Sequence, residues 1–226
     1  MPVIDQVDWG NSQTLNLHGD MSLGLWLRLR PGAVGQIIGR VRAGTTLDDN
    51  CAYELVVSGT DDAWDILYLH DTGTTRVIPT GTTYLSFDTN LQNAVWYYIC
   101  FSRDATAKTV TMYKGSMTEP LAIVGSAQSY TNNPDGGGGA NTKLIVGNIE
   151  NSPGAYGEQQ LDYGDIEQYY IWDRTLTLAE HEMAMAGEPS YTGLVLACLT
   201  GDDPEVDISG NGFTGIVTNT ILIAGH

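Results

Sequence analysis

The carboxylate-rich stretches are the places where acid–base chemistry could occur in this chain. Hydrolysis of a glycosidic bond with retention of configuration needs two carboxylates about 5 Å apart. Two strings come near this requirement, Asp162-Tyr-Gly-Asp165-Ile-Glu167 and Glu205-Val-Asp207-Ile-Ser-Gly210. Both are short of a complete catalytic set, and the second is expected in a turn. We therefore predict that the protein is not an enzyme, with glycoside hydrolysis as a remote alternative.

Binding of a hard cation is a second chemistry, because Ca²⁺ prefers six or more oxygen ligands from such clusters. Asp207 and Asn211 are oxygen donors in one tight turn, and Asp203 lies just before them. These three residues are the candidate calcium ligands. The structural alternative, which we favour, is that Asp207 and Asn211 cap their own turn through Asx hydrogen bonds. Calcium is the one cofactor that the sequence raises, without requiring it.

Exposed aromatic rings beside polar groups can stack on a sugar, which is the third chemistry. Trp64 stands beside an expected turn at Asp61 and Asp62, and Tyr68 lies on the strand expected at Asp65–Leu69. These four residues are the candidate ligand site, with Trp64 as the ring expected to be exposed. The alternative is that these strand-borne aromatics belong to the core, which is the commoner place for them.

Neither the histidines nor the cysteines indicate a reactive site. The four histidines show no metal-ligand spacing, and His181 is expected to be exposed on a helix. Cys51, Cys100 and Cys198 are widely spaced in apolar runs, which favours buried free thiols over disulfides.

The composition limits the partners. The chain has 226 residues and a formal net charge of −17, with only 10 Lys and Arg residues. This balance argues against nucleic acid and against an anionic membrane surface, because both require clustered cations. No window approaches the ~20 apolar residues of a membrane span, and the N-terminus lacks the features of a signal peptide. No repeat, linker or shift in composition interrupts residues 1–226, so we expect one domain.

Period-2 patterns predict that most of the chain is β-strand. From Met21 to Leu29, leucines alternate on one face and Trp26 lies on the other. Ala94–Arg103 is the most apolar run and is expected to be a central strand covered on both faces. Other strands are expected at Gln13–Leu17, Val34–Val41 after a turn at Pro31-Gly32, Cys51–Val57, Asp65–Leu69, Thr82–Phe87, Thr109–Tyr113, Glu119–Val124, Leu144–Val146, Leu194–Leu199 and Phe213–Ile223, with a glycine loop at Gly136–Gly139.

One stretch reads as a helix. Thr177 can serve as its N-cap, and Glu180 stands three residues later, which is the spacing of a capping box. Gly187 and Pro189 then end it. We expect one short helix near 177–186 in an otherwise all-β chain.

These elements together resemble the laminin-G-like branch of the concanavalin A-like lectin/glucanase superfamily, over nearly the whole chain. The resemblance rests on Leu23-Gly-Leu-Trp26, the strand Trp96–Arg103, Leu144-Ile-Val-Gly147, the series Gly164, Ile166, Trp172, Arg174, Leu176 and Glu180, and Asp207-Ile-Ser-Gly-Asn-Gly-Phe-Thr-Gly215. In many members the Ser-Gly-Asn-Gly segment precedes the rest. Because it comes last here, the final strands must pair with the first ones.

The resemblance implies a two-sheet antiparallel jelly-roll sandwich with the helix over one end. Members of the superfamily bind glycans or proteins, often with Ca²⁺. Its glucanases carry Glu-x-Asp-x-x-Glu on one strand, and neither carboxylate string of this chain completes that pattern.

Two functions follow as expectations. The first is a structural or adhesive module on the surface of a virus particle, such as a capsid decoration or tail-fibre protein. Its partners would be capsid or tail proteins, and it could form a homo-oligomer. The alternative is an extracellular, lectin-like carbohydrate-binding module, whose partner would be a glycan.

Overall fold

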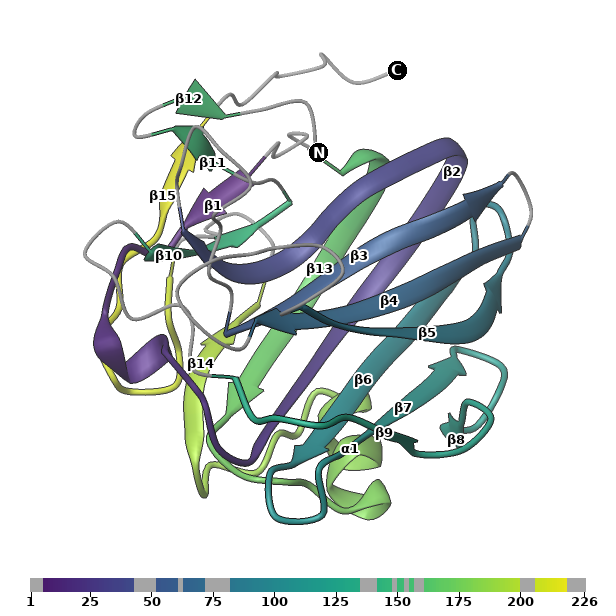
Figure 1. Cartoon of the computed structure of the whole chain (residues 1–226). Coiled ribbons are helices and arrows are strands. Elements are labelled where there is room, and N and C mark those ends of the chain that lie inside the picture. Colours follow the sequence, from purple (N-terminus) through teal and green to yellow (C-terminus); the bar gives the residue numbers. More distant parts are fainter. Residues whose placement is uncertain are drawn as a thin grey trace.

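Two antiparallel β-sheets face each other in the computed structural model of this chain, and one short helix covers part of the outer surface of one sheet (Figure 1). The structure describes residues 6–42, 52–60, 63–71, 82–134, 142–147, 150–152, 155–156, 161–199 and 206–218. The expected all-β, two-sheet sandwich is confirmed. The expected loop at Gly136–Gly139 lies outside the described residues.

The sheet without the helix, here called the opposite sheet, has the strand order β15-β1-β10-β2-β3-β4-β5. The helix-side sheet contains β14, β13, β2, β6 and β7 in that order, with β8 and β9 paired to β7. The bounds are β1 Gln6–Asp8, β2 Met21–Arg42, β3 Tyr53–Thr60, β4 Ala63–Asp71, β5 Thr82–Leu91, β6 Trp96–Asp104, β7 Thr109–Ser116, β8 Ala122–Ile123, β9 Gln128–Ser129, β10 Thr142–Val146, β11 Glu150–Ser152, β12 Ala155–Tyr156, β13 Asp162–Trp172, β14 Leu194–Cys198 and β15 Ile216–Thr218.

Strand β2 belongs to both sheets. Its first half, to Leu29, pairs with β6 and β13, and its second half, from Gly35, pairs with β3 and β10. The predicted break at Pro31-Gly32 is instead a bend within a continuous strand, which Figure 1 shows at the end of the sandwich. Gly32 has a φ of 87°, a value that favours glycine, so the corner can form without strain on a side chain.

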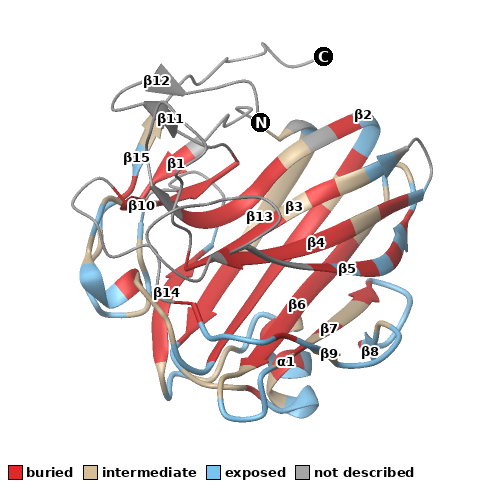
Figure 2. Cartoon of the chain, in the orientation of Figure 1, coloured by how far each residue is buried: buried red, intermediate tan, exposed pale blue. Residues whose placement is uncertain are grey.

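The core lies between the two sheets, where Figure 2 shows the strands largely buried. The alternation read from the sequence is confirmed. The leucines from Leu23 to Leu29 join the main core, whereas Trp26 packs in a second cluster on the outer face of the helix-side sheet. Strand β6 is buried on both faces, as expected for a central strand. Cys100 and Cys198 are buried and are not joined in a disulfide, as expected, and Cys51 lies outside the described residues.

The two ends of the chain meet in the opposite sheet. Strand β1 pairs with β15 through Val7 and Val217, so the expected pairing of first and last strands is confirmed. The expectation of a strand at Gln13–Leu17 is wrong, because Gln13–Leu15 forms a 3-10 turn. Leu15 of this turn is fully buried and belongs to the main core. The segment therefore contributes one side chain to the core and does not alternate between two sheet faces.

The helix α1 spans Leu178–Met185 and has the predicted capping box. The Thr177 hydroxyl accepts a hydrogen bond from the Glu180 backbone N–H, and the Glu180 carboxylate accepts one from the Thr177 backbone N–H. Arg174 also donates to Glu180 at 2.6 Å. Ala184 packs the helix against the outer cluster of the helix-side sheet. No helix among the described residues is long and apolar enough to cross a membrane.

Candidate functional site

The ligand site predicted around Trp64 is not confirmed at its aromatic residues. The Trp64 side chain is 1% exposed, and its indole N–H donates to the backbone carbonyl of Ala33 at 3.2 Å. Tyr68 is fully buried, and its hydroxyl accepts a hydrogen bond from Arg103 at 2.9 Å. The expectation of an exposed Trp64 ring is therefore wrong, and the core alternative holds for both aromatics. Asp61 and Asp62 lie outside the described residues.

The predicted calcium ligands are used inside their own turn. The Asp207 carboxylate accepts hydrogen bonds from the backbone N–H groups of Ala197 and Ser209 and from the Ser209 hydroxyl. The Asn211 amide donates to the backbone carbonyls of β14 residues Leu194 and Val195. Asp203 lies outside the described residues.

The Asp207 carboxylate is not free to ligate a Ca²⁺ ion in this arrangement. Both oxygens of Asp207 already face hydrogen-bond donors, whereas a hard cation needs lone pairs directed at it. Among the residues that the structure describes, no group of three or more His, Cys, Asp or Glu side chains could hold a metal. The hydrogen bonds agree with the Asx capping that the sequence offered as the structural alternative.

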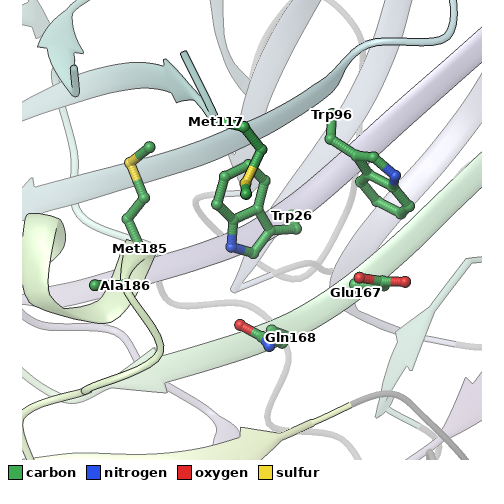
Figure 3. A pocket seen from close by; sticks show the side chains of 7 residues that line it. All are labelled: Trp26, Trp96, Met117, Glu167, Gln168, Met185 and Ala186. Carbon is green, nitrogen blue, oxygen red and sulfur yellow. The ribbon is translucent and has the colours of Figure 1, made fainter. Parts of the chain in front are cut away.

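A pocket with a volume of about 390 Å³ lies instead on the outer face of the helix-side sheet, beside the end of α1. Figure 3 shows the side chains around it. They come from β2, β6, the segment after β7, the bulged part of β13 and the end of the helix: Trp26, Trp96, Met117, Glu167, Gln168, Met185 and Ala186. We call this pocket the Trp26–Trp96 groove.

Adjacent strands bring the two tryptophans together. Trp26 is paired with Tyr98 across β2 and β6, and Trp96 lies two residues before Tyr98 on the same face. Such diagonal positions are ~7–8 Å apart, close enough for two indole rings to border one pocket. Trp26 is 8% exposed and Trp96 is half-buried, so each ring is fixed by packing and still borders the pocket. Trp26 meets the Tyr98 ring edge-on at 5.7 Å between centroids.

A β-bulge in β13 supplies the polar groups of the groove. Glu167 is opposite Trp26, but the next paired residue is Tyr169, opposite Leu25, so Gln168 is the extra residue. Gln168 has a φ of 44°, which is uncommon for a residue with a side chain. In a regular strand, Glu167 and Gln168 would point to opposite faces. The bulge lets both side chains line one pocket, as Figure 3 shows.

Two arginines and one carboxylate lie on the same face beyond the tryptophans. Arg28 contacts Asp165 through Nη2 at 2.7 Å and through Nε at 2.8 Å. Arg30 contacts the same carboxylate at 2.6 Å. The Arg28 guanidinium also stacks over Trp96 at 4.8 Å from the ring centroid, so it holds the indole in place from one side.

His181 lies under the helix rather than on its exposed side, so the sequence-based expectation is wrong. Its side chain is fully buried, and Nε2 is 2.9 Å from the Oγ of Ser102. Ser102 in turn shares a 2.8 Å hydrogen bond with Ser22. Burial lowers the pKa of His181 to about 4, so the imidazole is neutral near pH 7. These groups dock the helix on the sheet, and the groove lies at the end of that helix.

The sequence contained part of the signal for this groove. The alternation from Met21 to Leu29 places Trp26 on the face opposite the core leucines, and Trp96 begins the next strand of the same sheet. In the sequence, Glu167 stands out only as one carboxylate of an incomplete catalytic string. No local pattern marks Gln168 as a bulge, because its sequence neighbours continue the strand composition.

The comparisons with known proteins concern structure alone. No protein-family model matches the sequence, and no curated protein matches it. Among solved structures, a candidate carbohydrate-binding protein from Bacteroides ovatus is similar with a TM-score of 0.62 and 11% identity. The match covers 96% of this chain and 56% of that chain.

Two further solved structures are similar. One is the carbohydrate-binding module CBM40 of a Ruminococcus gnavus sialidase bound to α2,3-sialyllactose, with a TM-score of 0.55, 9% identity, and coverage of 78% of this chain and 86% of that chain. The other is the enzymatically active domain of tailspike protein 2 from bacteriophage CBA120, with a TM-score of 0.56 and 14% identity. That match covers 88% of this chain and 32% of the tailspike chain.

At 9% to 14% identity, these likenesses concern the fold alone. The chain has the concanavalin A-like lectin/glucanase fold that the sequence motifs predicted.

Proposed function

We propose that this protein is a non-catalytic carbohydrate-binding module and that the Trp26–Trp96 groove is its glycan site. The observation that carries the proposal is the grouping of two packed tryptophans with a carboxylate and an amide in one pocket of about 390 Å³. Indole rings offer apolar faces to the C–H groups of a pyranose, and Glu167 and Gln168 can exchange hydrogen bonds with its hydroxyls. Rings already fixed by packing lose little conformational freedom when a sugar binds.

The similarities support this choice over a purely structural role. Two of the similar structures are described as carbohydrate-binding, one of them with a bound sialyllactose. This chain is 9% to 11% identical to them, so they make glycan binding a reasonable expectation for the fold and do not identify the sugar.

A non-catalytic role is supported by the state of the neighbouring carboxylates. A glycosidase of this type needs one carboxyl group that donates a proton and a second that acts as nucleophile or base. Asp165 is two residues from Glu167 on β13, but its oxygens are held by Arg28 and Arg30 at 2.6–2.8 Å. Asp165 is thus held in ion pairs with two arginines rather than presented to a sugar in the groove.

The experiment is a glycan array followed by titration of the best-bound sugar, comparing the unmodified protein with Trp96→Ala. Trp96 is half-buried, so its replacement should leave the fold intact while removing one wall of the groove. We expect Trp96→Ala to weaken binding at least about tenfold, as for a stacking residue at a binding centre.

The matched control is Tyr191→Ala. Tyr191 is an aromatic residue that is 69% exposed and does not line the groove. Its replacement should leave glycan binding unchanged. Equal binding by the unmodified protein and Trp96→Ala would contradict the assignment of the site, and an array without any bound glycan would contradict the function.

Display of the module on a virus particle is a second candidate function. The supporting observation is the similarity to the tailspike domain, which extends over 88% of this chain. Such a component would be expected to form a symmetric oligomer, which size-exclusion chromatography with light scattering would detect. A monomer that associates with no particle proteins would contradict this role and leave the glycan site unaffected.

A further inference from the structure

The charges around the groove bear on which sugars it could take. The ionisable group that lines the pocket is Glu167. An ionised carboxylate accepts hydrogen bonds and has none to donate. Sugar hydroxyls can donate to it. The carboxylate of a sialic or uronic acid cannot donate a hydrogen bond to Glu167. It would also lie next to the negative charge of Glu167 in a partly desolvated site.

The two nearby cations are already engaged. Arg28 contacts Asp165 with two nitrogens and stacks on Trp96, and Arg30 contacts the same Asp165 carboxylate. A ligand carboxylate would compete with Asp165 for these guanidinium groups and would disturb the indole that Arg28 covers. The two arginines are also balanced by Asp165 and Glu167, so this face offers no net positive charge to an anion.

The charge of the whole chain acts in the same direction. With a formal net charge of −17, the protein repels an approaching anion over the distances at which screened charges still interact. The charges at the groove and the net charge of the chain therefore both disfavour an anionic sugar.

We infer that the Trp26–Trp96 groove selects uncharged pyranose units and rejects sugars that carry a carboxylate. This inference rests on the proposed glycan site and adds its ligand class. It separates this chain from the structurally similar CBM40, which was solved with a sialylated sugar.

The test is an array of matched glycan pairs that differ only in a terminal sialic acid or uronic acid, probed with the unmodified protein and two variants. We expect the unmodified protein to bind the uncharged member of a pair at least about tenfold more tightly. Asp165→Asn releases both arginines and should narrow or reverse this preference. Asp88→Asn removes the same charge from an exposed position on β5 and should leave the preference unchanged.

Three results would overturn the inference or its electrostatic basis, and they can be told apart. Equal or tighter binding of the acidic members, lost in Trp96→Ala, would show that the groove is the glycan site but has the opposite selectivity. Binding to neither member of any pair would overturn the proposed function and the inference with it. An Asp88→Asn effect as large as that of Asp165→Asn would show that net charge alone, without the arginine pair, sets the preference.

Discussion

Nε2 of His181 lies 2.9 Å from the Oγ of Ser102, and this hydrogen bond joins the helix α1 to the central strand β6. The Ser102 Oγ also lies 2.8 Å from the Oγ of Ser22, and the Leu176 backbone N–H donates to Ser22 at 2.9 Å. The segment before the helix and the helix itself are thus fixed to the same pair of serines. Because Met185 and Ala186 at the helix end border the Trp26–Trp96 groove, this network supports one wall of the candidate site.

Protonation of His181 should loosen this docking. Its pKa is about 4 in the folded protein because of burial and about 6.5 in an unfolded chain. Between these values the unfolded chain binds more protons, so the free energy of unfolding falls as the pH decreases from about 6.5 to about 4. The loss is on the order of 3 kcal/mol for His181. His70, also buried with a pKa of about 4, adds a loss of the same sign.

Urea denaturation at pH 7.5 and pH 4.5 would measure this loss in the unmodified protein and in His181→Gln. The variant keeps a neutral polar side chain and cannot be protonated, so its decrease between the two pH values should be smaller. His70 is present in both proteins and contributes equally. Identical decreases would exclude His181 as a source of the pH dependence.

The capping box at the start of α1 should contribute measurably to stability. Glu180 accepts hydrogen bonds from the Thr177 backbone N–H at 2.8 Å and from Arg174 at 2.6 Å. The Arg174 hydrogen bond and the Thr177 N–H lower the pKa of Glu180 to about 2. We expect Glu180→Gln to lower the free energy of unfolding by about 1 kcal/mol, the usual cost of weakening a cap.

Glu182→Gln is the matched control for Glu180, because it removes the same charge from an exposed position of the same helix. Its effect at pH 7 should lie within about 0.5 kcal/mol of zero. Thermal denaturation of both variants would measure the difference, and equal shifts in Tm would argue against a special role for the cap.

A close approach between Gly24 and Tyr98 should make Gly24 intolerant of a side chain. A Cβ on Gly24 would lie 2.1 Å from the Tyr98 hydroxyl oxygen and 2.7 Å from the ring carbon that carries it. Tyr98 is fully buried and can move little. We expect Gly24→Ala to destabilise the protein by about 2–3 kcal/mol. Gly19→Ala is the control, since a Cβ there would meet no atom within 4 Å.

The Tyr98 hydroxyl offers a separate prediction, because it is buried and no residue in the described part of the chain forms a hydrogen bond with it. An unsatisfied buried hydroxyl costs about 1–3 kcal/mol. Tyr98→Phe should therefore leave the free energy of unfolding unchanged or raise it, although most core substitutions lower it. Denaturant titration of Tyr98→Phe would decide, and a loss above about 1 kcal/mol would indicate a partner, such as an ordered water molecule, that the hydroxyl needs.

The features predicted well from sequence depend on local pattern. The alternation around Trp26 identifies the two faces of β2, and the Thr177–Glu180 spacing identifies the helix start. The β1–β15 pairing was predicted from the late position of the Ser-Gly-Asn-Gly segment. Each of these signals lies within about ten residues or follows from the resemblance to a known fold.

The features missed depend on contacts between distant segments. Trp64 reads as a turn-side aromatic, but its indole N–H reaches Ala33 at the corner of β2, 31 residues earlier. From the sequence, His181 is expected to be exposed on the helix. In the structure it lies on the face of α1 that contacts the sheet, where it meets Ser102, 79 residues away. Polar side chains can be buried when such a partner exists, and sequence spacing does not reveal the partner.

The bulge at Gln168 is the last feature that can be tested, and it links backbone strain to the candidate site. A φ of 44° is tolerated by glycine and disfavoured most strongly for β-branched residues. We expect Gln168→Val to destabilise the protein by about 1–2 kcal/mol and Gln168→Gly to be near neutral in stability. Both variants should weaken glycan binding, because both remove the amide that lines the groove. Denaturant titration and glycan titration of the two variants would separate these effects. Equal stabilities of Gln168→Val and Gln168→Gly would mean that β13 can pair with β2 without the bulge. The side chains at positions 167 and 168 would then point to opposite faces and could not both line the groove.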